Sequence, residues 1–503
     1  MGEQVLDLVI PYIQNTEDRN SVCLVSHRFY ETDAITRKRL TVHTLYYPNP
    51  PPSLTKRFPS IESLTLKGPP FDFNGYVIRL TPWIQQLALE FSCLKELHLR
   101  HLVVHDEDLE KLATTRGKDL RTLTIKMCEE FSTDGLMHVS KYCNQLKTLC
   151  LLGHPNYIQV KDGVWLHQLA LNSTVLEMFK FKNTDVSDAQ HLTLLAKNCC
   201  NSLTSLRIGN CSLSKLGDAF RYAVRLEHFS GHNSDNESDL VGFQFPPNMR
   251  SISIRGLPVT RCSIVFPFLN RIRKLNLLHL DMDEKCQCLL FKRCPNLEVL
   301  STCDLCGDKG LQVIGQFCKK LRKLTYDGLN VTHVGLIALV KGCANLESLT
   351  GFLRVNSNEA LKCVGTHLKN LRHFHILLEN EDCTRNLRLD NGVRAMLKGC
   401  SKLERLYIFF LNVELTDVGL EYVGKYGANL RFLSLICAGK SDAGLVKLSE
   451  GCPRLRKLKL TGCPFSKQAV VSSVFNIPSL RYVWFESWDH GDDIRLALTR
   501  PKF

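Results

Sequence analysis

The 503-residue chain lacks the features that mark a membrane-spanning or secreted protein. No stretch of about 18 uncharged apolar residues occurs, so we expect no membrane-crossing helix. The first residues, Met1 to Val5, do not place a basic segment before an apolar one, and a secretory signal is not expected. The sequence also shows no phosphate-binding loop, no metal-ligand cluster and no nucleophile paired with a base. These absences favour a non-catalytic protein.

The net charge and the apolar content indicate what kind of partner and what kind of fold to expect. The 64 Lys and Arg against 50 Asp and Glu give a net charge of +14, which favours an anionic partner or cofactor. Basic and aromatic residues do not alternate as they do in single-strand binders, so no nucleic-acid partner is expected. The apolar fraction of 44% is ample for a continuous core.

One motif, C-x-x-L-x-x-L, recurs along the chain. Its clearest copies begin at Cys143, Cys200, Cys294, Cys318, Cys343, Cys400 and Cys452. From Leu297 onward, the first leucines follow one another at steps of 24, 25, 25, 32, 27, 25 and 25 residues. A period of about 20–29 residues is typical of leucine-rich repeats, with one strand and one helix in each repeat. The alternating leucines predict a half-buried strand, and phrases such as Thr416-Asp417 and Ser441-Asp442 predict helix starts.

The 22 cysteines have a structural interpretation. Seven of them occupy one repeat position, where a small apolar side chain packs well, so we expect reduced thiols. Cys303/Cys306 and Cys286/Cys288 are close pairs outside this position. Zinc is the weaker interpretation, since no second pair lies at zinc-finger spacing.

The first 42 residues do not follow the repeat. Apolar residues between Val5 and Ile13 predict one helix, residues 16–30 a second, and a basic third helix is expected to end near Leu40. We therefore expect a small helical module at residues 1–42, followed by a solenoid of about 17–18 repeats at residues 43–503. A helical cap that only shields the end of the solenoid is the alternative.

The phrase D-R-N-S-V-C-L-V-S-H-R-F-Y at residues 18–30 resembles the F-box of the plant auxin and jasmonate receptors. Residues 57–68, R-F-P-S-I-E-S-L-T-L-K-G, match the same receptors, and L-D-N-G-V-R at 389–394 and V-F-P-F at 265–268 favour the coronatine-insensitive branch. The resemblance implies an α/β fold, a leucine-rich-repeat horseshoe behind an F-box. It also implies a substrate-recognition subunit of an SCF ubiquitin ligase with no catalytic residues of its own.

The resemblance implies that the F-box binds a Skp1-like adaptor and, through it, a cullin. The apolar residues expected to pack internally or against the adaptor are Val9, Ile13, Val22, Leu24, Val25 and Phe29. The usual Leu-Pro at the entrance is missing and Phe29 replaces a tryptophan, so the F-box is expected to be shortened at its start.

The hormone pocket implied by the resemblance is diverged. Family members bind the hormone carboxylate with a ring of arginines, whose positions here hold Phe71, Thr325, His375 and Thr461. Two pocket tyrosines are replaced by Phe352 and Phe409, and a tryptophan by Phe432. We therefore expect weak or absent binding of a jasmonate-type ligand.

Three basic residues match positions that hold an inositol polyphosphate in the auxin-type receptors, namely Lys67, Arg100 and Arg405. The implied substrate is a transcriptional repressor of the jasmonate-ZIM type, recruited in the nucleus or also in the cytoplasm. The alternative is a repeat scaffold or pseudo-receptor that has left the ligase and lost the hormone response.

Overall fold

The computed structural model contains two compact units, Met1–Asn248 and Met249–Phe503, and each is described by itself. The structure describes residues 9–13, 16–69, 78–153, 158–159, 163–183, 188–235, 238–255, 259–277, 283–303, 305–328, 330–354, 357–379, 387–486 and 494–497. Phe71, one of the predicted pocket residues, lies outside these ranges.

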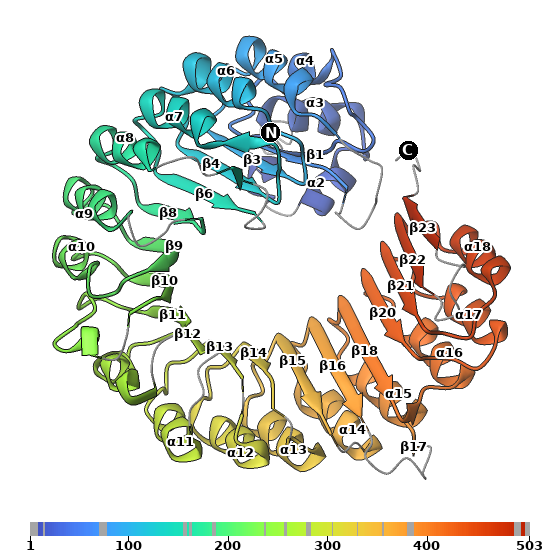
Figure 1. The fold of residues 1–503 in the computed structure, drawn as a ribbon. Helices are drawn as coiled ribbons and strands as arrows, with labels where there is room; N and C mark the ends of the chain where they lie inside the picture. Colours follow the sequence, from blue (N-terminus) through green and yellow to red (C-terminus); the bar gives the residue numbers. More distant parts are fainter. Residues whose placement is uncertain are drawn as a thin grey trace. The chain divides into compact units, whose positions relative to one another are not determined.

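The first unit places helices on one side of a parallel sheet (Figure 1). Its strands are β1 (Arg39–His43), β2 (Ser63–Lys67), β3 (Glu96–Arg100), β4 (Thr122–Lys126), β6 (Thr148–Leu152), β8 (Met178–Phe181), β9 (Ser205–Cys211) and β10 (His228–Asn233), with a separate short pair, β5 (Phe131–Ser132) and β7 (Ile158–Gln159). Its helices are η1 (Ile10–Tyr12), α2 (Thr16–Val22), α3 (His27–Thr36), α4 (Leu54–Arg57), α5 (Thr81–Glu90), α6 (Asp106–Arg116), α7 (Thr133–Tyr142), α8 (Val164–Asn172), α9 (Ala189–Asn198), α10 (Gly217–Tyr222) and η3 (Ser238–Leu240).

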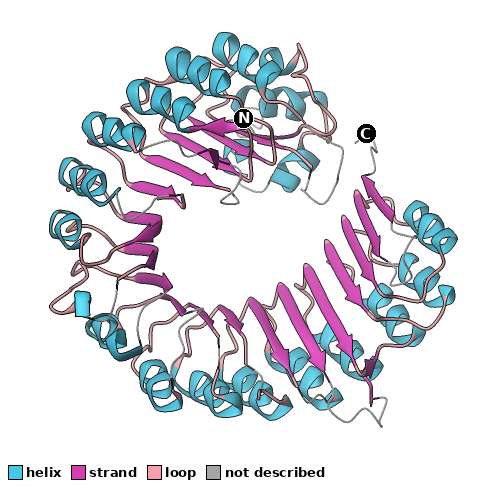
Figure 2. Cartoon of the chain, viewed as in Figure 1, coloured by secondary structure: helices cyan, strands magenta, loops and turns pink. Residues whose placement is uncertain are grey.

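The second unit has the same layering (Figure 2). Its strands are β11 (Ser251–Arg255), β12 (Lys274–Leu277), β13 (Val299–Thr302), β14 (Lys323–Tyr326), β15 (Ser348–Leu353), β16 (His373–Glu379), β18 (Arg405–Leu411), β20 (Phe432–Ile436), β21 (Lys457–Thr461), β22 (Tyr482–Glu486) and the antiparallel β23 (Ile494–Ala497), with a separate pair, β17 (Leu387–Arg388) and β19 (Val413–Glu414). Its helices are η4 (Val259–Phe268), α11 (Glu284–Lys292), α12 (Gly307–Phe317), α13 (His333–Gly342), α14 (Asn358–His367), α15 (Asp390–Gly399), α16 (Asp417–Tyr426), α17 (Asp442–Ser449) and α18 (Lys467–Asn476).

The leucines of the motif form the core between strands and helices. Leu300, Leu324 and Leu349 are partners in register on three successive strands, and each is fully buried. Side chains alternate along a strand, so the residues next to each leucine on its own strand point to the opposite face of the sheet. We call this face, which no described helix of the repeats covers, the helix-free face. The predicted α/β leucine-rich-repeat fold with one strand and one helix per repeat is confirmed. The division after residue 42 and the number of repeats stay predictions.

A ladder of aspartates joins successive repeats at the helix starts. Asp390 accepts hydrogen bonds from the backbone N–H and the Oγ1 of Thr416, at 2.9 and 2.8 Å, and Thr416 in turn caps α16. Asp417, the first residue of α16, does the same for Ser441. Similar bonds join Asp106 to Ser132, Asp308 to Thr332 and Asp442 to Ser466. In these five pairs, the start of one helix therefore positions the start of the next.

At α16 and α17, the glycine of the phrase Asp-x-Gly leaves room for the aspartate of the preceding repeat, whereas Ala469 holds the equivalent position in α18. A Cβ on Gly419 would lie 2.4 Å from Asp390 Oδ1, and one on Gly444 would lie 2.4 Å from Asp417 Oδ1. Burial acts to raise the pKa of Asp417, but hydrogen bonds from Lys440 and Ser441 hold it below its usual value. The Asp417 carboxylate is therefore ionised at neutral pH and accepts bonds from the next repeat.

The repeated cysteines pack where each helix returns to its strand. Cys318, Cys400 and Cys452 are fully buried, and their thiols donate to backbone carbonyls of the preceding repeat. Burial raises the pKa of Cys400 and of Cys452 to about 12, which keeps these thiols protonated. The 20 cysteines whose side chains the structure describes are all free.

One cysteine assignment is wrong. Cys199, and not Cys200, fills the repeat position: it is fully buried, ends α9 and donates to Ser173 O at 3.2 Å. Leu203 N bonds to Cys199 O, whereas Leu146 N bonds to Cys143 O, so this turn is one residue longer than in the other repeats. Cys200 is partly exposed instead.

The N-terminal helices also differ from the prediction. The helix expected over residues 16–30 is divided, because α2 ends at Val22 and α3 begins at His27, where the Ser26 side chain accepts from Phe29 N. Leu24 and Val25 thus lie in the turn between two helices. Leu40, the expected end of a third helix, lies in β1.

Candidate functional site

The turn between α2 and α3 exposes apolar side chains. Leu24 and Val25 are 73% and 68% exposed, and Val9 is also exposed. Ile13, Val22 and Phe29 are half-buried. The sequence did not single out two further exposed residues of this module, Tyr12 and Ile35. Apolar side chains exposed together on so small a module are typical of a protein-docking surface.

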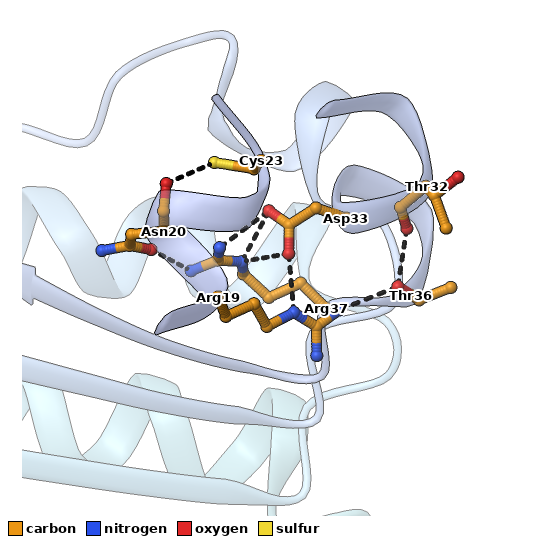
Figure 3. A network of polar contacts seen from close by, with 7 residues as sticks. All are labelled: Arg19, Asn20, Cys23, Thr32, Asp33, Thr36 and Arg37. Carbon is orange, nitrogen blue, oxygen red and sulfur yellow. Dashed lines mark hydrogen bonds and ion pairs between the residues drawn. The ribbon is translucent and has the colours of Figure 1, made fainter. Parts of the chain in front are cut away.

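A buried charge network holds this module together. Asp33, on α3, lies between two guanidinium groups (Figure 3). Arg19 Nε donates to Asp33 Oδ1 at 2.6 Å, and Arg37 Nη2 donates to Asp33 Oδ2 at 2.7 Å. All three side chains are at least nine-tenths buried. The ends of α2 and α3 are therefore fixed relative to each other, and with them the exposed turn.

A row of basic side chains crosses the helix-free face of the first unit. His43, Lys67, Arg100 and Lys126 are partners in register on β1 to β4, so neighbouring members lie about one strand spacing apart, roughly 4.8 Å. We call these four residues the basic row. Two of the predicted inositol-phosphate residues are thus adjacent, and Lys126 extends them. Aligning the repeats at their leucines reveals Lys126 as well.

The third predicted inositol-phosphate residue, Arg405, lies on β18 of the second unit. Its guanidinium carbon lies 4.9 Å from the centre of the Phe432 ring on β20, at cation–π distance. Arg405 also acts on His375: partial burial and the charge of Arg405 lower the pKa of this histidine. His375 is therefore neutral near pH 7, with its ring 3.9 Å from that of Tyr407.

The predicted pocket residues that the structure describes fall on three rows of the helix-free face of the second unit, and Phe432 lies on the third, between Arg405 and Lys457 in register. Phe352, Phe409 and Thr461 share the row nearest the strand ends, and Leu377 and Ile436 lie between them in register. We call the stretch Phe352–Leu377–Phe409–Ile436 the apolar row. All four side chains are half-buried. Sequence reasoning missed Leu377 and Ile436, although the alternation of the strands indicates both.

The second row is polar. Thr325 is a partner of Thr350, which in turn pairs with His375. At the far end of the apolar row, Thr461 Oγ1 donates to Glu486 Oε2 at 3.2 Å, and Lys459 lies 3.3 Å from the same carboxylate. The face thus combines an apolar row and neutral polar groups with cationic side chains, of which Lys323 and Arg405 are exposed.

The described residues show neither a metal-binding cluster nor a membrane-crossing helix. They contain no group of three His, Cys, Asp or Glu side chains placed to hold a metal ion. The Sγ atoms of Cys288 and Cys306, one from each of the two close cysteine pairs, are 4.0 Å apart. Within the same ranges, no helix has the length and apolar character needed to cross a membrane.

Comparison with known proteins agrees with these features. The sequence model of the F-box family matches residues 1–39. Coronatine-insensitive protein 1 of Arabidopsis thaliana is 37% identical over 99% of this chain and 88% of its own length. Coronatine-insensitive protein homolog 1b of Oryza sativa subsp. japonica is 38% identical, with 99% and 87% covered. GRR1-like protein 1 of Arabidopsis thaliana is 31% identical, with 96% and 86% covered.

The F-box, the repeats and these relatives define a class: the chain is an F-box/leucine-rich-repeat protein, a non-catalytic substrate receptor of SCF ubiquitin ligases. Within that class it belongs to the coronatine-insensitive family.

Proposed function

We propose that this chain docks on a Skp1-like adaptor through the exposed turn of its F-box and presents a transcriptional repressor of the jasmonate-ZIM type for ubiquitination in the nucleus. The observation that carries the adaptor step is the exposure of Leu24 and Val25 in the turn between α2 and α3, the two helices that the Arg19–Asp33–Arg37 network joins. An apolar turn held in one conformation loses little conformational freedom on binding, which favours a stable complex.

We expect the double variant Leu24→Glu/Val25→Glu to lose adaptor binding by at least about 100-fold, because two central apolar contacts typically cost 2 kcal/mol or more each. Binding of the full chain to a Skp1-like protein is measured by calorimetry. Leu89→Glu, which alters an exposed leucine on α5, serves as the control and should bind like the parent. If the parent chain itself does not bind the adaptor, the protein is a repeat scaffold outside the ligase.

The repressor is proposed to dock on the helix-free face of the second unit, over the apolar row. Aromatic and aliphatic side chains at Phe352, Leu377, Phe409 and Ile436 suit apolar side chains of a peptide. We expect this face to bind a hormone carboxylate weakly, because Thr325, His375 and Thr461 stand at the positions where the family has arginine. Each charge-assisted hydrogen bond that is missing costs about 1.5–3 kcal/mol.

We expect coronatine not to increase capture of a repressor degron peptide, with or without inositol hexakisphosphate. The triple variant Thr325→Arg/His375→Arg/Thr461→Arg should gain ligand-dependent capture by at least tenfold, while Ser301→Arg, on the same face at β13, should not. Fluorescence polarisation of a labelled degron peptide measures both. Strong ligand-dependent capture by the parent chain would show that other residues replace the arginines.

An inositol polyphosphate is the proposed cofactor of the first unit, at the basic row. Lys67, Arg100 and Lys126 place cations on three adjacent strands, which suits a ligand with several phosphates. The same degron assay, repeated with Lys67→Gln/Arg100→Gln, tests whether the cofactor contributes to capture.

A further inference from the structure

A small cavity lies where the F-box passes into the first strand. Its volume is about 230 Å³. Its lining combines the apolar residues Pro11 and Ile13 with four cationic residues, Arg19, Arg37, Lys38 and Arg39. Pockets for drug-sized ligands measure roughly 300–1,000 Å³, so this cavity accommodates a single small group.

The cations around the cavity outnumber their carboxylate partners. Arg19 and Arg37 share one carboxylate, that of Asp33. Lys38 Nζ lies 2.8 Å from Glu62 Oε1, and Lys95 Nζ lies 3.1 Å from Oε2 of the same carboxylate. Arg39 forms no ion pair with any residue that the structure describes. Four cationic side chains thus line the cavity, and only two described carboxylates pair with them.

The negative partial charge at the C-terminal end of α3 offsets part of this excess of positive charge. Thr36, the last residue of the helix, also lines the cavity, and a helix C-terminus carries about half a negative elementary charge. Arg19 and Arg37 are buried near this helix end. Hydrogen bonds to Asp33 and Thr36 fix the guanidinium group of Arg19, and a bond to Asn20 helps to fix that of Arg37. The remaining positive charge is therefore carried partly by guanidinium groups that are held in a fixed place and partly by the exposed side chains of Lys38 and Arg39.

We propose that this cavity binds a phosphate group, with Arg39 as the side chain that closes on it. A phosphate monoester carries about 1.5–2 negative charges at pH 7, close to the charge that the lining leaves unbalanced. Guanidinium groups match phosphate oxygens in geometry, and the apolar side chains of Pro11 and Ile13 in the lining limit the competing water. Arg39 is exposed and free of the Asp33 network, so it can move without disturbing the F-box.

The cavity is separate from the basic row. Arg39 begins β1 and His43 ends it, so the two sites lie at opposite ends of the strand, about 13 Å apart at 3.3 Å per residue. A ligand with several phosphates on the basic row does not fill the cavity, which holds only one group.

The test is calorimetric titration of the full chain with inorganic phosphate at constant ionic strength. We expect Arg39→Gln to weaken phosphate binding at least tenfold. Lys111→Gln, which removes an exposed cation from α6, and Lys67→Gln/Arg100→Gln, which alters the basic row, should bind phosphate at this site like the parent. Thermal melting of each variant checks that it is folded.

Two further ligands identify the source of the phosphate. Phosphoserine and inositol hexakisphosphate are titrated in turn, and the one whose affinity falls in Arg39→Gln but not in Lys67→Gln/Arg100→Gln is the one that uses the cavity. Equal phosphate affinity of Arg39→Gln and the parent would overturn the proposal, as would an equal loss in Lys111→Gln. Neither outcome depends on adaptor or repressor binding, so the proposed function is judged separately.

Discussion

Replacing Asp33 with Asn is expected to lower the free energy of unfolding of the F-box by about 3–5 kcal/mol. The variant keeps the size of the side chain but removes the only carboxylate that Arg19 and Arg37 are seen to share among the described residues. Two nearly buried guanidinium groups then lack a counterion, and their desolvation is no longer offset. Hydrogen–deuterium exchange of the α2 and α3 amides measures the loss locally, without requiring the whole chain to unfold in one step.

Glu31→Gln is the matched control for this variant. Glu31 lies on the same helix, is exposed, and is 3.3 Å from His27, an exposed pair that contributes at most about 1 kcal/mol. Its exchange should match that of the parent. Asp33→Asn should also weaken adaptor binding, because the turn that carries Leu24 and Val25 is no longer fixed. Unchanged exchange in Asp33→Asn would mean that the network does not stabilise the F-box.

The second large effect is expected for Gly419→Ala, which should destabilise the repeats around α16 by about 2–3 kcal/mol. The new methyl group would lie 2.2 Å from Leu415 Cδ1 and 2.4 Å from Asp390 Oδ1, so both must move. Overpacking costs about 1–3 kcal/mol, and the displaced carboxylate also loses its bonds to Thr416. The higher helix propensity of alanine returns only about 1 kcal/mol.

Gly217→Ala provides the comparison, because a Cβ at that position in α10 has no neighbour within 4 Å. We expect this variant to be neutral or slightly stabilised, by about 0.4–1 kcal/mol. Exchange rates of the α15, α16 and α17 amides distinguish the two variants. If Gly419→Ala protects these amides as well as the parent does, the aspartate ladder tolerates a side chain at this point.

The parts of the fold that depend on local pattern are predictable from the sequence. Leu300, Leu324 and Leu349 alternate with polar residues and repeat at a constant step, and both signals report burial directly. The shift from Cys200 to Cys199 was not predictable in this way, because one extra residue in a turn leaves the spacing of the leucines unaffected. The break between α2 and α3 also depends on a cap, Ser26, that competes with a continuing helix.

Contacts between repeats were harder to predict than the repeats themselves. The phrase Asp-x-Gly is visible in the sequence, but the sequence does not show why a glycine stands there. The structure shows that Asp390 of the preceding repeat lies too close to Gly419 for a side chain to fit without a shift. For the candidate sites, the sequence singles out residues such as Lys67, Arg100, Phe352 and Phe409, and their roles stay predictions. Their neighbours Lys126 and Leu377 become evident only once the strands are paired in register.

The register of the strands also determines which changes in chain length the protein can tolerate. Leu297, Leu321 and Leu346 are 24 and 25 residues apart, so excising one whole repeat would bring the next strand into the same position, with its leucines still facing the helices. The removal of a single residue within a strand would instead turn every following side chain of that strand to the other face. Members of such a family can therefore be expected to differ in length by whole repeats or in the loops, while the strands themselves keep a fixed length.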